Sequence, residues 1–167
     1  MKNILKVTNR STDQVVYNLP ELHMRRVFTP GEVKEIPEKE LRTLNQADGG
    51  AILVKHYLKV DDEAWVKKNL PDAPIEYFWD LDDIKRCILE DSVELFEETL
   101  EFAPLGVIDT IKDLAWKLPM TDMNKIQVLK EKTGFDTLAA VAVMKPAEGT
   151  QKTSAPTKRE RLRRREA

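Results

Sequence analysis

The spacing of apolar residues changes character near residue 60. Before this point, apolar residues occur in short runs that are rich in β-branched residues and bounded by turn-forming residues, which is typical of strands. The runs ILKVTN (4–9) and QVVYNL (14–19) predict two such strands, joined by the turn-forming RSTD (10–13). After residue 60, apolar residues recur at intervals of three and four, which predicts amphipathic helices.

The clearest turn signal lies at Thr29–Glu32, within RRVFTPGEVKEI (25–36). Pro30 fixes its own φ near the value that the second position of a type II turn requires, and Gly31 allows the positive φ of the third position. Because an extended run flanks the turn on each side, the segment predicts a β-hairpin.

Two short elements complete the first part of the chain. Residues 37–46 predict a helix with Leu41 and Leu44 on one face. The apolar run 51–60 fits either a short helix or a strand. We expect a helical first part and an extended end at Leu58–Val60.

The second part of the chain predicts a compact cluster of helices. The expected helices cover residues 61–69, 80–90, 91–103, 104–118, 121–134 and 136–144. The best apolar stripe belongs to the helix 104–118 and consists of Val107, Ile111, Leu114 and Leu118. Short links between helices of this length favour antiparallel packing. Candidate N-caps are Asp61 or Asp62, Asp80, Asp91 and Asp136, and Gly134 is the candidate C-cap.

This periodicity ends after Met144. Residues 145–167 contain a single large apolar residue, Leu162, so they cannot bury enough apolar surface to offset the entropy of ordering. The sequence therefore predicts an α+β protein. Its expected parts are a small β-rich N-terminal subdomain (1–60), a compact helical bundle (61–144) and a flexible, basic, low-complexity C-terminal tail (145–167).

Charges are separated into blocks along the chain. Residues 61–103 hold 14 acidic and 4 basic residues, whereas residues 145–167 hold 8 basic and 3 acidic residues. An acidic block and a basic tail in one chain permit head-to-tail association between subunits. They equally permit the tail to fold back on its own body.

No residue pattern indicates catalysis or a cofactor. His23 and His56 lie far apart, and Cys87 falls on the inner side of a predicted helix, which favours a buried apolar role. Gly49 and Gly50 lack the spacing and the lysine of a phosphate-binding loop. We therefore predict that the protein is not an enzyme, has no catalytic residues and holds no cofactor.

The acidic run Asp80, Asp82 and Asp83 has two interpretations. Oxygen ligands suit hard cations, but Glu90 and Asp91 do not complete a calcium-binding loop. Carboxylates that interact with the dipole of a helix N-terminus are the simpler explanation. No metal site is predicted.

Four aromatic residues surround the connector between the two parts: Trp65, Tyr77, Phe78 and Trp79. Packing in a core or between subdomains is one interpretation of this cluster. An exposed anchor for a binding partner is the other.

One candidate partner-binding surface is the outer side of the helix 91–103. It is formed by Glu94, Glu97, Glu98 and Glu101. Like charges four residues apart destabilise an isolated helix, and basic groups on a partner would relieve this repulsion. A solvated helix face is the alternative.

The other candidate is the terminal stretch KRERLRRREA (158–167). Its arginines are Arg159, Arg161, Arg163, Arg164 and Arg165. Such a cluster can bind phosphates without sequence preference, or carboxylates on an acidic protein surface. A solubilising terminus is the alternative.

Two stretches carry a resemblance to known proteins. They are QVVYNLPELHMRRVFTPGEVKEIP (14–37) and FAPLGVIDTIKDLAWKLPMTDMNKIQVLKEKTGFD (102–136). They resemble small, mostly uncharacterised proteins that tailed bacteriophages and prophages encode near the genes for virion structural proteins. The resemblance spans roughly residues 1–138 and implies no catalytic residues.

Together, the resemblance and the charge blocks favour a non-enzymatic virion structural protein of a bacteriophage, associated with the head (the capsid) or the head–tail connector. Its expected partners are other virion proteins or copies of itself, and packaged DNA through the tail. It would be made in the cytoplasm of the bacterial host and reside in the virion. No membrane association is expected, because no stretch approaches 18 apolar residues. The alternative is a phage-encoded regulatory or accessory module that binds nucleic acid or a host protein through the basic tail.

Overall fold

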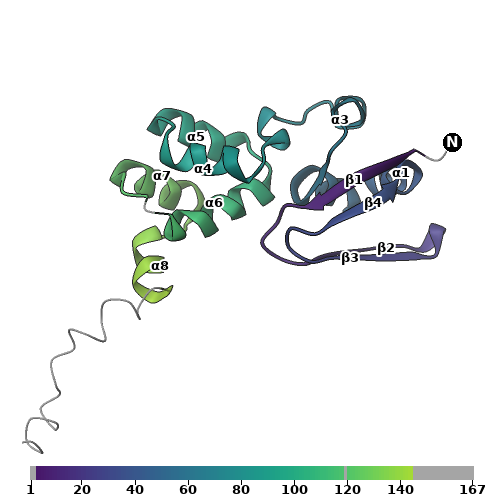
Figure 1. Ribbon diagram of the computed structural model, residues 1–167, viewed down its shortest axis with the longest axis horizontal. Helices are drawn as coiled ribbons and strands as arrows, with labels where there is room; N and C mark the ends of the chain where they lie inside the picture. The colour runs from purple at the N-terminus through teal and green to yellow at the C-terminus, as the bar shows by residue number, and fades with distance from the viewer. Residues whose placement is uncertain (1–2, 119, 145–167) are drawn as a thin grey trace, which may run out of the picture.

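Two lobes follow one another along the chain in the computed structural model, which describes residues 3–118 and 120–144 (Figure 1). The N-terminal lobe combines strands with short helices, and the described part of the C-terminal lobe is built from helices. The predicted α+β class is therefore confirmed. The tail predicted for residues 145–167 lies outside the described residues.

The strands of the N-terminal lobe form two small antiparallel sheets. They are β1 (Ile4–Asn9), β2 (Val15–Leu19), β3 (Met24–Phe28), β4 (Val33–Pro37) and β5 (Leu58–Val60). One sheet has the order β4-β1-β5, and the other pairs β2 with β3. Alternate residues of β1 and β2 point inward, as the period of two in a strand requires.

The turn predicted at Thr29–Glu32 forms, but the predicted hairpin does not. The Glu32 N–H donates to the Thr29 carbonyl at 3.0 Å, and Gly31 has the required positive φ of 76°. However, β3 pairs with β2, while β4 pairs with β1. The turn residues are hydrogen-bonded to the end of β1. The Gly31 N–H donates to the Asn9 carbonyl, and the Asn9 N–H donates to the Glu32 carbonyl, both at 2.9 Å. The turn therefore leads from one sheet to the other.

The side chain of Asn9 ties the two sheets together at this end. It is fully buried, and its Nδ2 donates to the carbonyls of Phe28 at 3.2 Å and Asp13 at 2.8 Å. Its Oδ1 accepts from the backbone N–H and the hydroxyl of Ser11, each at 2.9 Å. All polar groups of this buried amide are thus engaged, which fixes the β1–β2 connection against the end of β3.

The short helices of this lobe are η1 (Pro20–Leu22), α1 (Glu38–Gln46), α2 (Gly50–Ile52), η2 (Leu53–Tyr57), α3 (Glu63–Asn69) and η3 (Ile75–Phe78). Leu41 and Leu44 are buried, as predicted for α1. The run 51–60 is helical and then extended, as predicted, with η2 in the π-helical form. Asp62 is the N-cap of α3, because its carboxylate accepts from the Trp65 N–H at 2.9 Å.

The C-terminal lobe contains α4 (Leu81–Leu89), α5 (Val93–Phe102), α6 (Leu105–Lys117), α7 (Met123–Thr133) and α8 (Thr137–Met144). The caps predicted at Asp80, Gly134 and Asp136 are confirmed. At α5 the cap is Ser92 rather than the predicted Asp91, since the Ser92 hydroxyl accepts from the Leu95 N–H.

The buried side of α6 differs from the predicted stripe. Its fully or nearly buried residues are Gly106, Val107, Ile108, Ile111 and Ala115, while Leu114 and Leu118 are only partly buried. The helix packs against α4, against α8 and against η2 of the other lobe. With several packing partners, the buried side extends to Ile108 and Ala115, which a single stripe could not reveal.

The buried apolar residues form two separate cores. The first joins the strands to Trp65, Val66, Leu70 and Tyr77, and the second begins at Ile84. The sequence-based boundary at residue 60 differs from this division, because residues 61–78 pack with the strands. A change of hydrophobic period marks a change of element type, and it does not tell which core an element joins.

The lobes meet where α6 begins. A Cβ at Gly106 would lie 2.5 Å from the His56 carbonyl oxygen, so only glycine permits this close approach. The Leu105 N–H donates to Nδ1 of His56 at 3.0 Å, and the Thr110 hydroxyl donates to the Arg10 carbonyl at 3.2 Å. Short polar contacts of this kind fix the direction in which α6 leaves the N-terminal lobe.

Candidate subunit interface

The outer side of α5 combines carboxylates with exposed apolar side chains. Glu94, Glu98 and Glu101 are exposed, as predicted, and they are flanked by Leu95, which is 52% exposed, and Phe102, which is 59% exposed. We call these five residues the α5 face. Sequence reasoning found its charges but missed its apolar side chains, although Leu95 and Phe102 are seven residues apart and thus lie on one side of a helix.

Glu97, the fourth predicted residue, does not belong to this face. Its carboxylate lies 3.6 Å from Nζ of Lys132 on α7, so it is neutralised within the chain. Among the described residues, no such ion pair involves Glu94, Glu98 or Glu101. The structure therefore separates one internally paired carboxylate from three that face outward.

The spacing of the carboxylates on the α5 face, and the position of Glu101, are unfavourable for the helix. Glu94 and Glu98 are four residues apart, and Glu98 and Glu101 are three apart, so both pairs repel. Glu101 also lies in the last turn, which contains no basic residue. Negative charge at a helix C-terminus is unfavourable because the helix dipole is negative there. A bound cation would relieve both effects.

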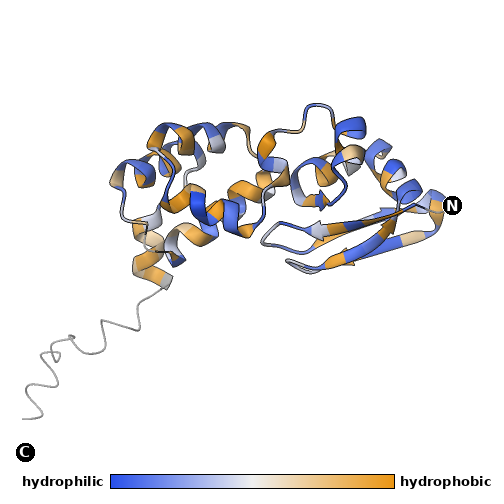
Figure 2. Ribbon diagram, turned by 45° about the horizontal axis from the view of Figure 1, so that its top comes forward, coloured by the Kyte–Doolittle hydropathy of each residue, from blue (hydrophilic) through white to orange (hydrophobic). Residues whose placement is uncertain are grey.

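α8 is an apolar helix with little cover. It contains no charged residue, and Leu138, Val141 and Val143 are 52%, 38% and 72% exposed. Figure 2 shows it in the hydrophobic colours at the end of the helical lobe. A helix that is apolar on all sides is normally buried, so this exposure makes α8 a candidate interface. The all-apolar character of α8 is visible in the sequence, because the run LAAVAV (138–143) contains no polar residue.

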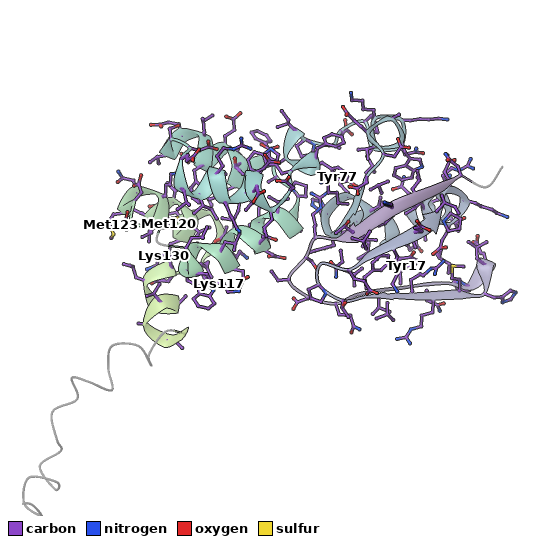
Figure 3. The ribbon with its side chains drawn as sticks, viewed as in Figure 1. Tyr17, Tyr77, Lys117, Met120, Met123 and Lys130 are labelled. Carbon is purple, nitrogen blue, oxygen red and sulfur yellow. The ribbon has the colours of Figure 1, made fainter. Side chains whose placement is uncertain are left out.

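The start of α8 is firmly attached to the lobe. Asp136 caps the helix by accepting from the Ala139 N–H at 3.0 Å, and its carboxylate lies 3.4 Å from Nζ of Lys130. The hydrogen bond from the Ala139 N–H and, to a lesser extent, the ion pair with Lys130 hold the pKa of Asp136 below its ordinary value. Met120, Met123 and Lys130 gather at this end of the lobe (Figure 3), and Met123 is 60% exposed.

The acidic run at the start of α4 is explained by helix capping. The Asp80 carboxylate accepts from the Asp83 N–H at 2.9 Å, and the Asp83 carboxylate accepts from the Asp80 N–H at 3.0 Å. This reciprocal pair is a capping box, and it lowers the pKa of Asp80. Asp83 also pairs with Arg86. Within residues 3–118 and 120–144, no cluster of His, Cys, Asp and Glu has the geometry to hold a metal ion.

The histidines and the cysteine are placed apart from one another. His23 is exposed, while His56 takes part in the contact between the lobes. Cys87 is 1% exposed, and burial raises the pKa of its thiol to about 11. A thiol with this pKa stays protonated at neutral pH and is a poor nucleophile.

The aromatic residues of the connector pack inside the protein. Trp65 and Tyr77 belong to the N-terminal core, Phe78 packs against that core, and Trp79 packs against the helical core. The Tyr77 hydroxyl is bonded to the backbone of Val54, Leu58 and Val60 at 3.1–3.2 Å. Of the two interpretations of this cluster, packing in and between the lobes is therefore the one that fits.

A buried carboxylate that the sequence did not single out holds α1 against the β2–β3 sheet. Glu40 is 2% exposed and accepts from the Tyr17 hydroxyl at 2.7 Å and from Nε and Nη2 of Arg26 at 2.9 Å each. Burial and the neighbouring Glu40 carboxylate raise the pKa of Tyr17. The burial of Glu40 could have been expected from the sequence, because Glu40 shares a side of the helix with Leu41 and Leu44.

A cavity of about 680 Å³ lies between the lobes, beside Arg10 and Trp79. Its charged lining residues are Arg10, Lys59, Asp61, Asp80, Asp113 and Lys117, so opposite charges balance. The Arg10 guanidinium stacks 4.3 Å from the ring centre of Tyr77 and donates to the Tyr77 carbonyl at 2.7 Å. Burial lowers the pKa of Arg10 to about 10, so it remains charged at neutral pH. These contacts hold the Arg10 side chain against Tyr77 within the N-terminal lobe.

Comparisons of the chain with protein-family models, with curated proteins and with solved structures find no match. Among the described residues, no helix is both long and apolar enough to cross a membrane. The arginines predicted as a binding site, Arg159 to Arg165, lie outside the described residues.

Proposed function

We propose that this chain is a non-enzymatic structural protein of a bacteriophage virion, associated with the head or the head–tail connector, and that it binds neighbouring subunits. The observation that carries this proposal is α8, an apolar helix that is fixed at its start and exposed along its length. A permanent subunit contact is the usual reason for a protein to display such a helix.

The exposed apolar side chains of this helix would contribute to the stability of a subunit contact. Leu138, Val141 and Val143 are each one-third or more exposed. Covering them would contribute on the order of 1–2 kcal/mol per side chain. Met123, at the start of α7, is a further exposed apolar side chain of the same lobe. The placement in a virion draws on the sequence resemblance, and the binding of neighbours draws on α8.

Quantitative mass spectrometry of purified particles tests the proposal. The particles come from the phage or prophage that carries the gene, and a phage replication protein serves as the control for contamination. We expect the chain at a fixed ratio to the major head proteins, well above the control. A level no higher than that of the replication protein contradicts the proposal and favours a regulatory module that acts in the host cell.

A further inference from the structure

We propose that the α5 face binds the basic segment 158–167 of a second copy, so that copies associate head to tail. This inference rests on the proposed function and names one of the neighbours that the chain binds. Two independent features carry it: the composition of the α5 face, and the position of α5 relative to α8, the last described element before the basic segment.

The α5 face requires a partner that is both cationic and apolar. Its centre is formed by Glu94, Glu98 and Glu101, and its edge by Leu95 and Phe102. The three carboxylates lack ion-pair partners within the described part of the chain. A purely apolar partner would bury these charges without compensation, which is unfavourable. A purely cationic partner would leave Leu95 and Phe102 exposed.

The basic segment has the complementary composition. Residues 158–167 hold six basic and two acidic residues, with Leu162 in the middle. Arginine presents a planar set of donors that can bind a carboxylate with two parallel hydrogen bonds. Arg161 and Arg163 flank Leu162 directly, so cations lie next to an apolar side chain in this segment, just as carboxylates lie next to apolar side chains on the α5 face.

A second copy can place this segment on the α5 face more directly than the same copy can. α8 packs against α6 and α7, and it lies on the opposite side of the helical lobe from α5 in both ribbon views (Figures 1 and 2). The 13 residues between Met144 and Lys158 span at most about 50 Å when extended. Within one copy the segment would have to reach around the lobe, whereas a second copy can present its segment to the α5 face without this constraint. The contact joins two different surfaces, so it can repeat.

Sedimentation velocity of the full chain at low and high salt tests this inference with two variants. The face variant is E94Q/E98Q/E101Q, and the tail variant is R159Q/R161Q/R163Q/R164Q/R165Q. The control E21Q/E35Q/E90Q removes the same number of exposed carboxylates elsewhere. We expect the intact chain and the control to self-associate at low salt, and the face variant to lose about tenfold or more in association constant. We expect the association constant of the tail variant to fall by a similar factor.

A mixing experiment then identifies the two surfaces as partners. The face variant retains the basic segment and the tail variant retains the α5 face, so an equal mixture should form a complex that neither variant forms alone. A monomeric intact chain at low salt, or an unaffected face variant, overturns the inference. Two further results also overturn the inference. In the first, the tail binds duplex DNA and the chain does not self-associate. In the second, the chain stays monomeric and its hydrodynamic radius changes when the tail charges are removed, which indicates a contact within one copy. If the chain is nevertheless found in particles, the proposed function stands and only this partner is wrong.

Discussion

Glu40 is the most buried carboxylate in the described part of the chain, and its partners are specific. We expect Glu40→Gln to lower the free energy of unfolding by about 1–3 kcal/mol, because the Arg26 guanidinium loses its charged partner. Tyr17→Phe removes one hydrogen bond and should cost about 1 kcal/mol. Urea denaturation of the three proteins measures both values. Equal stability of Glu40→Gln and the parent protein would show that this network does not stabilise the lobe.

His56 makes stability depend on pH. Burial, and to a lesser extent Lys55 and Arg10, lower the pKa of His56 below its ordinary value. The unfolded chain therefore takes up a proton that the folded chain excludes, and stability falls as pH decreases from about 7.5 to 5.5. His56→Asn keeps an acceptor for the Leu105 N–H but cannot titrate, so its stability should change less over this interval.

The matched control for this pH dependence is His23→Asn. His23 is exposed and has a φ of 49°, a left-handed conformation that asparagine tolerates. Thermal unfolding at several pH values between these limits compares the three proteins. If His56→Asn keeps the full pH dependence of the parent protein, the titration of His56 is not its source.

Single residues were the hardest level to predict from the sequence. The caps Asp62, Asp80 and Asp136 were predictable because a cap depends only on residues within one turn. Asn9 and Glu40 were not, because their partners come from other elements. Their roles depend on contacts that a single sequence does not display.

At the scale of elements, Gly106 determines how closely α6 approaches η2. Glycine to alanine in a helix ordinarily stabilises by up to about 1 kcal/mol. At Gly106 the added Cβ would meet the His56 carbonyl at 2.5 Å and Cγ of Arg10 at 2.8 Å, so the sign should reverse. We expect Gly106→Ala to lower the melting temperature and to loosen the contact between the lobes. Differential scanning calorimetry and hydrogen exchange at Leu105 and Arg10 measure these effects, and a raised melting temperature would contradict them.

The existence and type of most elements were predictable, while their partners were not. The strands, the helix 38–46 and the five C-terminal helices all appear in the apolar pattern, because that pattern is local. The turn at Thr29–Glu32 was also recognised correctly. Its interpretation as a hairpin was wrong because the partner of β4 is β1, which lies far back in the chain. Strand pairing is a non-local choice that turn residues do not encode.

At the scale of the whole molecule, the charge blocks were visible in the sequence, but the α5 face and the exposure of α8 required the structure. A period of 3.6 predicts which side of a helix is apolar, and it does not tell whether that side is covered. For α8 the apolar residues surround the helix, so any packing against α6 and α7 leaves part of them exposed. The account therefore predicts that a neighbouring subunit covers α8.

The contact at α8 can be tested by measuring whether an α8 variant is incorporated into particles. L138Q/V141Q/V143Q makes the exposed side polar without weakening the helix, since glutamine is a better helix former than valine. The control I52Q/I75Q changes exposed apolar residues of the other lobe. Each protein is supplied in cells that produce particles without their own copy, and the purified particles are analysed by quantitative mass spectrometry. The account predicts that the parent protein and the control are incorporated, whereas the α8 variant stays outside the particles as a folded protein with an unchanged melting temperature. Incorporation of the α8 variant at the level of the parent protein would contradict it.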